Sequence, residues 1–183
     1  MNKPTAFVAL LRGINVGKAK RIAMADLRKL VEELGFGDVK TLLNSGNIVF
    51  SAPPKKVATA AARIESAIAL QLGVTSRVAV ISAEELAAAI SNNPFSGAVT
   101  DPARFLIAVT ADPAGLRPHK ALARQDWAPE ALAVEDRIAW IWCANGILES
   151  KAATALNRAL RDGITMRNWA TMNKLHALCA AII

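Results

Sequence analysis

Two successive parts of this chain show the same order of hydrophobic patterns, and that order restricts the fold more than any single motif. In the first eighty residues, apolar runs and segments with helical spacing predict strand, helix, strand, strand, helix, strand. That order is typical of the split βαβ unit, the ferredoxin-like α/β plait. The second half begins the same order again. We therefore expect an α+β protein with two ferredoxin-like lobes, antiparallel sheets, and extra helices at the linker and the C-terminus.

The elements expected in the first half are bounded by turn and capping residues. Strands are expected over residues 5–11, 39–43, 48–51 and 77–81, and helices over residues 24–34 and 53–73. The hairpin between the two middle strands turns at Asn44-Ser45-Gly46-Asn47. Ser82 and Glu85 form a capping box, which predicts a further helix through Ile90.

The second half is less complete in its pattern. We expect a strand over residues 104–110, a helix over 113–124, a hairpin over 131–143, and helices over 148–160 and from 169 to the C-terminus. A fourth strand is not evident unless residues 164–166 supply it, so this lobe is expected to be incomplete. The stretch 92–97, rich in Asn, Pro, Ser and Gly, breaks the pattern. We predict an N-terminal lobe plus linker helix over residues 1–97 and a C-terminal lobe with the C-terminal helix over 98–183. A single larger α+β sheet is the alternative.

The charge balance favours anionic partners. The formal net charge is +7, and such a surface attracts nucleic acid, nucleotides or phosphorylated metabolites, although it can also serve solubility alone. Hydrophobic residues make up 53% of the chain, and no apolar run reaches the length of a membrane span. We expect a cytoplasmic protein with no membrane partner and no cofactor. Cys143 and Cys179 lack metal-ligand spacing, so we expect reduced core cysteines and no metal site.

Candidate ligand-binding residues fall into three groups of polar side chains, placed where packing alone does not require them. One group follows the first strand in a Gly-rich loop that matches neither the Walker nor the dinucleotide-binding pattern. The second is the hairpin tip, and the third follows Gly163. Arg and Lys bind phosphate or carboxylate, Asn can read a polar edge, and Trp offers an apolar face. The candidates are Arg12, Asn15, Lys18, Asn44, Ser45, Asn47, Thr165, Arg167, Asn168 and Trp169.

The charges are distributed unevenly in a way that connects two of these groups. Residues 12–21 carry four cations and no acid, and residues 151–174 carry five cations against Asp162 alone. We expect these segments to meet in a basic pocket between the lobes that binds an anionic, phosphate-bearing small molecule or nucleic acid. Two alternatives stay open. One is an enzyme acting on a small phosphorylated or carboxylated metabolite, and the other is a non-catalytic nucleic-acid- or protein-interaction module.

Structural roles also remain open for the same residues. The hairpin-tip residues can serve only the turn, Trp169 can fill a packing interface, and Arg167 can cap a helix. Conventional catalytic sets are poorly represented in the sequence: no G-x-S-x-G motif occurs, and His176 with Cys179 is better explained by core packing. Phe7 and Phe50 lack the surrounding pattern of an RNA-recognition motif and are expected in the core.

Several segments in order along the chain carry a family resemblance. They include Leu11-Arg12-Gly13-Ile14-Asn15-Val16-Gly17, the Asn44–Phe50 hairpin, Asn93-Pro94-Phe95 and Thr165-Met166-Arg167-Asn168-Trp169. With these motifs the chain resembles the bacterial family catalogued as domain of unknown function 1697. The resemblance implies two ferredoxin-like plaits in one compact protein and transfers no catalytic residue. Trp140-Ile141-Trp142 stands where the family pattern implies a tyrosine, which argues against a tyrosine-dependent role there.

Overall fold

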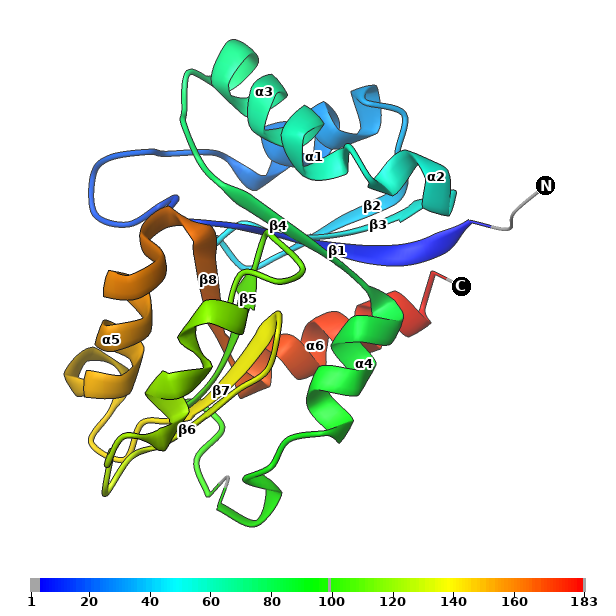
Figure 1. Ribbon diagram of the computed structural model, residues 1–183. Coiled ribbons are helices and arrows are strands. Elements are labelled where there is room, and N and C mark those ends of the chain that lie inside the picture. Colours follow the sequence, from blue (N-terminus) through cyan, green and yellow to red (C-terminus); the bar gives the residue numbers. More distant parts are fainter. Residues whose placement is uncertain (1–3, 99, 183) are drawn as a thin grey trace. The chain divides into compact units, whose positions relative to one another are not determined.

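The chain forms two compact units, each built on one four-stranded antiparallel sheet (Figure 1). The computed structural model describes residues 4–98 and 100–182. Unit 1 comprises Met1–Leu86 and Leu175–Ile183, and unit 2 comprises Ala87–Lys174. The α+β class with two ferredoxin-like lobes is confirmed, since each sheet has the same strand order with helices between its strands. The domain boundary that the sequence predicts after residue 97 remains a prediction.

The sheet of unit 1 has the strand order β2-β3-β1-β4. Its strands are β1 (Thr5–Leu11), β2 (Gly37–Leu42), β3 (Asn47–Ala52) and β4 (Val78–Ser82). The helices are α1 (Met24–Glu33), α2 (Pro54–Val57) and α3 (Ala60–Leu72), and Figure 1 shows α1 and α3 side by side on one face of the sheet. The central strand β1 pairs antiparallel with both β3 and β4, with Leu10 opposite Asn47. The end of β1 and the start of β3 therefore lie at the same end of the sheet.

Alternate residues of β1, namely Phe7, Ala9 and Leu11, belong to the hydrophobic core of unit 1. From Ala6 to Leu11 every residue is buried, which explains why this part of the strand reads as a continuous apolar run. The rings of Phe7 and Phe50 stack with their centroids 5.9 Å apart, and Phe36 lies 4.7 Å from Phe50. The expectation that Phe7 and Phe50 belong to the core is confirmed, so they do not form an exposed stacking platform for RNA bases.

The sheet of unit 2 repeats the topology with the order β6-β7-β5-β8. Its strands are β5 (Phe105–Thr110), β6 (Ala131–Val134), β7 (Ile138–Trp142) and β8 (Ile164–Asn168). The expectation of an incomplete second lobe was wrong, because β8 pairs with β5 along its whole length, from Leu106 opposite Asn168 to Thr110 opposite Ile164. Residues 166–168 are only half-buried. Half-buried positions do not require apolar side chains, which explains why this strand lacks a clear hydrophobic pattern in the sequence.

Three predicted helices differ from the structure in their bounds or type. The segment after Pro113 begins with turns, and its helix is the 3-10 helix η2 (Arg117–Arg124). Its backbone donors reach the third residue back, as in His119 N–H to Leu116 O, and a proline near its start removes a donor. The helix after Pro53 divides into α2 and α3. The helix predicted from residue 148 is preceded by η3 (Ile147–Glu149) and continues as α5 (Lys151–Leu160).

The remaining helices follow sequence signals closely. α4 (Ala83–Ser91) starts at the predicted capping box, in which Ser82 Oγ accepts from Glu85 N–H and the Glu85 carboxylate accepts from Ser82 N–H. α6 (Trp169–Ala180) is the last helix of the described residues, and the 3-10 turns η1 (Ser96–Ala98) and η4 (Arg161–Gly163) join neighbouring elements. Among the described residues, no helix combines the length and the hydropathy that crossing a bilayer requires.

Candidate functional site

The segment that follows β1, residues 12–22, is an irregular basic loop with an unusual backbone. Four of its residues have left-handed φ angles, namely Gly13 at 63°, Asn15 at 54°, Gly17 at 62° and Lys20 at 51°. Glycine adopts this region freely and asparagine tolerates it, but lysine does so at a cost. A backbone with so many left-handed residues in a short stretch needs interactions that hold it in this conformation.

Asn15 fastens the basic loop through its side-chain amide. Its Nδ2 donates to Ile22 O at 2.9 Å and to Asn44 O at 2.7 Å, and its Oδ1 accepts from Ile22 N–H at 2.8 Å. The Asn15 backbone N–H also donates to Lys20 O at 3.0 Å. These bonds close the loop on itself and tie it to the turn between β2 and β3.

That turn, residues 43–47, is the hairpin tip, and it packs directly against the base of the basic loop. Gly46 O accepts from Leu11 N–H at 2.8 Å. A Cβ atom added at Gly46 would lie 2.7 Å from Leu11 Cβ and 2.8 Å from Ile14 Cδ1, so only glycine fits there. The buried Asn47 amide donates to Leu42 O at 2.8 Å and to Ser45 Oγ at 2.9 Å, which shapes the tip. The two loops thus form one packed assembly.

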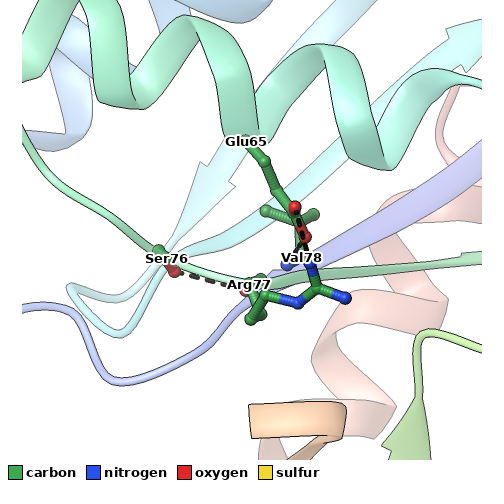
Figure 2. A network of polar contacts seen from close by, with 4 residues as sticks. All are labelled: Glu65, Ser76, Arg77 and Val78. Atoms are coloured by element: carbon green, nitrogen blue, oxygen red, sulfur yellow. Dashed lines mark hydrogen bonds and ion pairs between the residues drawn. The ribbon is translucent and has the colours of Figure 1, made fainter.

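A third segment, between α3 and β4, contacts the start of the basic loop. Figure 2 shows the polar contacts of this segment with Glu65 of α3. Ser76 Oγ donates to Arg12 O at 2.9 Å, and Arg12 N–H donates to Arg77 O at 2.9 Å. The Glu65 carboxylate accepts from Val78 N–H at 2.8 Å and pairs with the Arg77 guanidinium at 3.3 Å. Arg77 is therefore neutralised by an acid from α3.

The exposed cations of the basic loop differ from Arg77 in their charge environment. Lys18, Lys20 and Arg21 are exposed, and Arg12 is half-buried at the end of β1. Within residues 4–98 and 100–182, none of the three exposed cations forms an ion pair with an acidic side chain. The next acid along the chain is Asp26, in the first turn of α1. Three uncompensated charges on a fastened loop can bind phosphate or another multiply charged anion.

The predicted residues of unit 2 lie together at the end of β8 and the start of α6. Thr165 is buried within β8. Asn168 caps α6, since its Oδ1 accepts from Thr171 N–H at 2.9 Å. The Trp169 ring meets the buried Phe105 ring edge-to-face, with the centroids 5.3 Å apart and the planes at 89°. These three side chains have clear structural roles within unit 2.

Arg167 is the charged member of that group. Its guanidinium donates to Met166 O at 2.9 Å, and burial lowers its pKa to about 10. It therefore remains a cation at neutral pH. A desolvated guanidinium is a strong donor to carboxylate or phosphate.

The structure thus brings the predicted residues together in two sets. Arg12, Asn15, Lys18, Asn44, Ser45 and Asn47 lie in the two packed loops of unit 1, and Thr165, Arg167, Asn168 and Trp169 lie in one segment of unit 2. That both sets line one pocket stays a prediction. Sequence reasoning did not name Lys20, Arg21 or Ser76 as site residues. The run of cations could have indicated the first two, whereas nothing in the sequence marks the hydroxyl of Ser76.

The remaining candidate reactive groups in the described part of the chain are the potential metal ligands and the two cysteines. Among the described residues, no group of three His, Cys, Asp or Glu side chains is arranged to hold a metal ion. Cys143 and Cys179 are buried, and burial raises the pKa of the Cys179 thiol to about 11. Both are core thiols, as expected from the sequence.

Comparison with known proteins gives a family and a fold. A family model described as a protein of unknown function (DUF1697) matches residues 5–140. Conserved bacterial protein SP0830 from Streptococcus pneumoniae has a similar solved structure, with 26% identity and a TM-score of 0.75. The match covers 97% of this chain and 99% of that one. None of the curated proteins matches the chain.

Proposed function

We propose that this chain, which belongs to the DUF1697 family of proteins of unknown function, binds a phosphate-bearing anion at the basic loop of unit 1. Lys18, Lys20 and Arg21 supply the charge. Asn15 acts as a positioning residue, because its amide fixes the loop without carrying charge itself. The hairpin tip packs against the base of the loop through Gly46, which contacts Leu11 and Ile14.

The observation that carries this proposal is the fastening of a loop whose three exposed cations, Lys18, Lys20 and Arg21, form no ion pair among the described residues. An ordinary solvated basic loop has no need of four left-handed residues and a side chain with three hydrogen bonds. Of these four residues, Lys20 adopts the left-handed region at a cost, and strained backbone persists where the surrounding structure enforces it and clusters at ligand-binding sites. A rigid loop loses less conformational entropy on binding than a flexible one.

The exposure of the three cations also indicates the kind of ligand. Their side chains face solvent, so the ligand is approached from an open surface. Each charge-assisted contact contributes about 1.5–3 kcal/mol at most, and less where water competes. A single phosphate group is therefore expected to bind weakly, and a ligand with several phosphates more tightly.

Calorimetric titration at low salt tests the proposal with three probes: inorganic phosphate, pyrophosphate and inorganic polyphosphate. We expect affinity to rise in that order and to fall as salt is added. The double variant K18Q/K20Q should lose most of the binding. The matched control K55Q/K56Q removes the same charge from the exposed helix α2, at the opposite end of β3, and should bind like the wild type. Equal binding by both variants would place the anion elsewhere.

A further inference from the structure

Two exposed apolar side chains accompany the cations of the basic loop. Val16 in the loop is 70% exposed, and Leu43 in the hairpin tip is 53% exposed. They are neighbours in sequence of Asn15 and Asn44, which are joined by a hydrogen bond of 2.7 Å. The other large apolar side chains that are exposed in the described residues are Leu70, Ile147 and Leu148. The end of the sheet that carries uncompensated charge therefore also presents aliphatic surface.

Leu43 has a second unfavourable feature, its backbone. Its φ is 57°, in the left-handed region that glycine or asparagine would occupy with less strain. Of the five described non-glycine residues with positive φ, three lie in the basic loop and the hairpin tip: Asn15, Lys20 and Leu43. A leucine that is both strained and half-exposed contributes little to folding. Its presence points to a contact made outside the chain.

We propose that the ligand of this surface is a nucleic-acid duplex, with the cations on its phosphates and with Leu43 and Val16 against the sugars and base edges of a groove. This proposal rests on the proposed function and deepens it. Phosphate contacts supply the affinity for nucleic acid and carry no sequence information. Aliphatic side chains that enter a groove beside lysine and arginine are a known means of adding shape contacts.

The composition of the loops favours a duplex over a single strand. Proteins that bind single-stranded RNA or DNA stack the bases on aromatic side chains. Neither residues 12–22 nor residues 43–47 contain an aromatic residue. In a duplex, by contrast, phosphates recur along both edges of a groove. Several cations of one loop can therefore contact phosphates without any base being unstacked.

The amount of apolar surface argues against a lipid bilayer as the partner. A single myristoyl chain gives only marginal membrane binding. The side chains of one valine and one leucine contain fewer carbons than that chain, so with three exposed cations they would give weaker anchoring still.

The first test measures the affinity for a short DNA duplex by fluorescence anisotropy over a range of salt concentrations. With three phosphate contacts, the slope of log affinity against log salt should be about −2.7. K18Q/K20Q should reduce the magnitude of that slope by about 1.8, and K55Q/K56Q should leave it unchanged. A slope that is the same in both double variants would contradict the use of these lysines on the duplex.

The second test separates the aliphatic contact from the charge. Leu43→Asn is compatible with the left-handed backbone, so the variant should fold at least as stably as the wild type. We expect its duplex affinity to fall roughly fivefold with an unchanged salt slope, because a partly buried leucine contact is lost. Its affinity for inorganic polyphosphate, which has no sugars or bases, should not change. The control Leu148→Asn removes an exposed leucine from unit 2 and should bind the duplex normally.

The outcomes distinguish the two proposals. Wild-type duplex binding by Leu43→Asn, or equal affinity for duplex and polyphosphate, would overturn the duplex proposal and leave phosphate binding intact. Tighter binding to a single strand of the same length, or to vesicles of phosphatidylglycerol, would overturn it in favour of that partner. Failure to bind polyphosphate and duplex alike would refute the proposed function as well.

Discussion

Replacing Asn15 with alanine tests whether one side chain holds the basic loop in shape. The substitution removes three hydrogen bonds, to Ile22 O, from Ile22 N–H and to Asn44 O. Each contributes about 0.5–1.5 kcal/mol net. Alanine at a φ of 54° adds roughly 1 kcal/mol of backbone strain. Because water reaches part of this site, we expect the free energy of unfolding to fall by about 2–4 kcal/mol.

A matched variant separates the two contributions. Asn15→Gly loses the same three side-chain bonds but adopts the left-handed backbone without strain. Its loss should be smaller than that of Asn15→Ala by about 1 kcal/mol. Equal losses in the two variants would show that the backbone at this position carries no strain.

The assay must report on unit 1. All four tryptophans, at positions 127, 140, 142 and 169, belong to unit 2, so tryptophan fluorescence follows the other unit. Urea unfolding followed by far-ultraviolet circular dichroism includes the sheet of unit 1, and hydrogen exchange gives a local readout at the Ile22 amide, which donates to Asn15 Oδ1. The reasoning is refuted if Asn15→Ala unfolds within about 0.5 kcal/mol of the wild type and the Ile22 amide keeps its protection.

Three further predictions concern other parts of the chain. Gly46→Ala should lower the free energy of unfolding by about 2–4 kcal/mol, because its Cβ would lie 2.7 Å from Leu11 Cβ at a left-handed φ; an unchanged urea midpoint would contradict this. The Asp136 carboxyl should titrate near its lowered pKa of about 2, because Arg117 donates a hydrogen bond to it, and carbon-13 NMR would expose an ordinary value instead. Since its unfolded pKa is about 3.9, this ion pair stabilises the fold above that pH and is lost as pH falls towards 2. The buried Cys179 thiol, with a pKa of about 11, should react with a disulfide reagent at mildly alkaline pH only after unfolding, so rapid labelling of the native protein would argue against its burial.

The first lobe could be predicted from sequence because its elements are marked locally. The continuous apolar run of β1 gave both ends of that strand correctly, and the Ser82–Glu85 capping box gave the start of α4. The weaker predictions concern segments in which tertiary pairing outweighs local pattern. β8 is a strand because it completes the sheet beside β5, although three of its five residues are only partly buried.

The candidate site was only partly predictable, and for a different physical reason. The sequence shows that an asparagine side chain can donate and accept hydrogen bonds, but it does not show which groups are its partners. The amides of Asn15 and Asn47 donate to the backbone carbonyls of Ile22, Asn44 and Leu42, so the contribution that we propose for them is to position the cations. The strain at Leu43 is equally invisible in the sequence, because it depends on the path of the hairpin tip.

The central claim is that the fastened loop after β1 receives phosphate groups. It is tested most directly by titrating nitrogen-15-labelled protein with pyrophosphate and following the backbone amide signals. The account predicts that the shifted signals fall within residues 12–22 and 43–47, and that the shifts disappear in K18Q/K20Q but not in K55Q/K56Q. Shifts confined to other residues, or none at pyrophosphate concentrations that saturate the calorimetric signal, would contradict it.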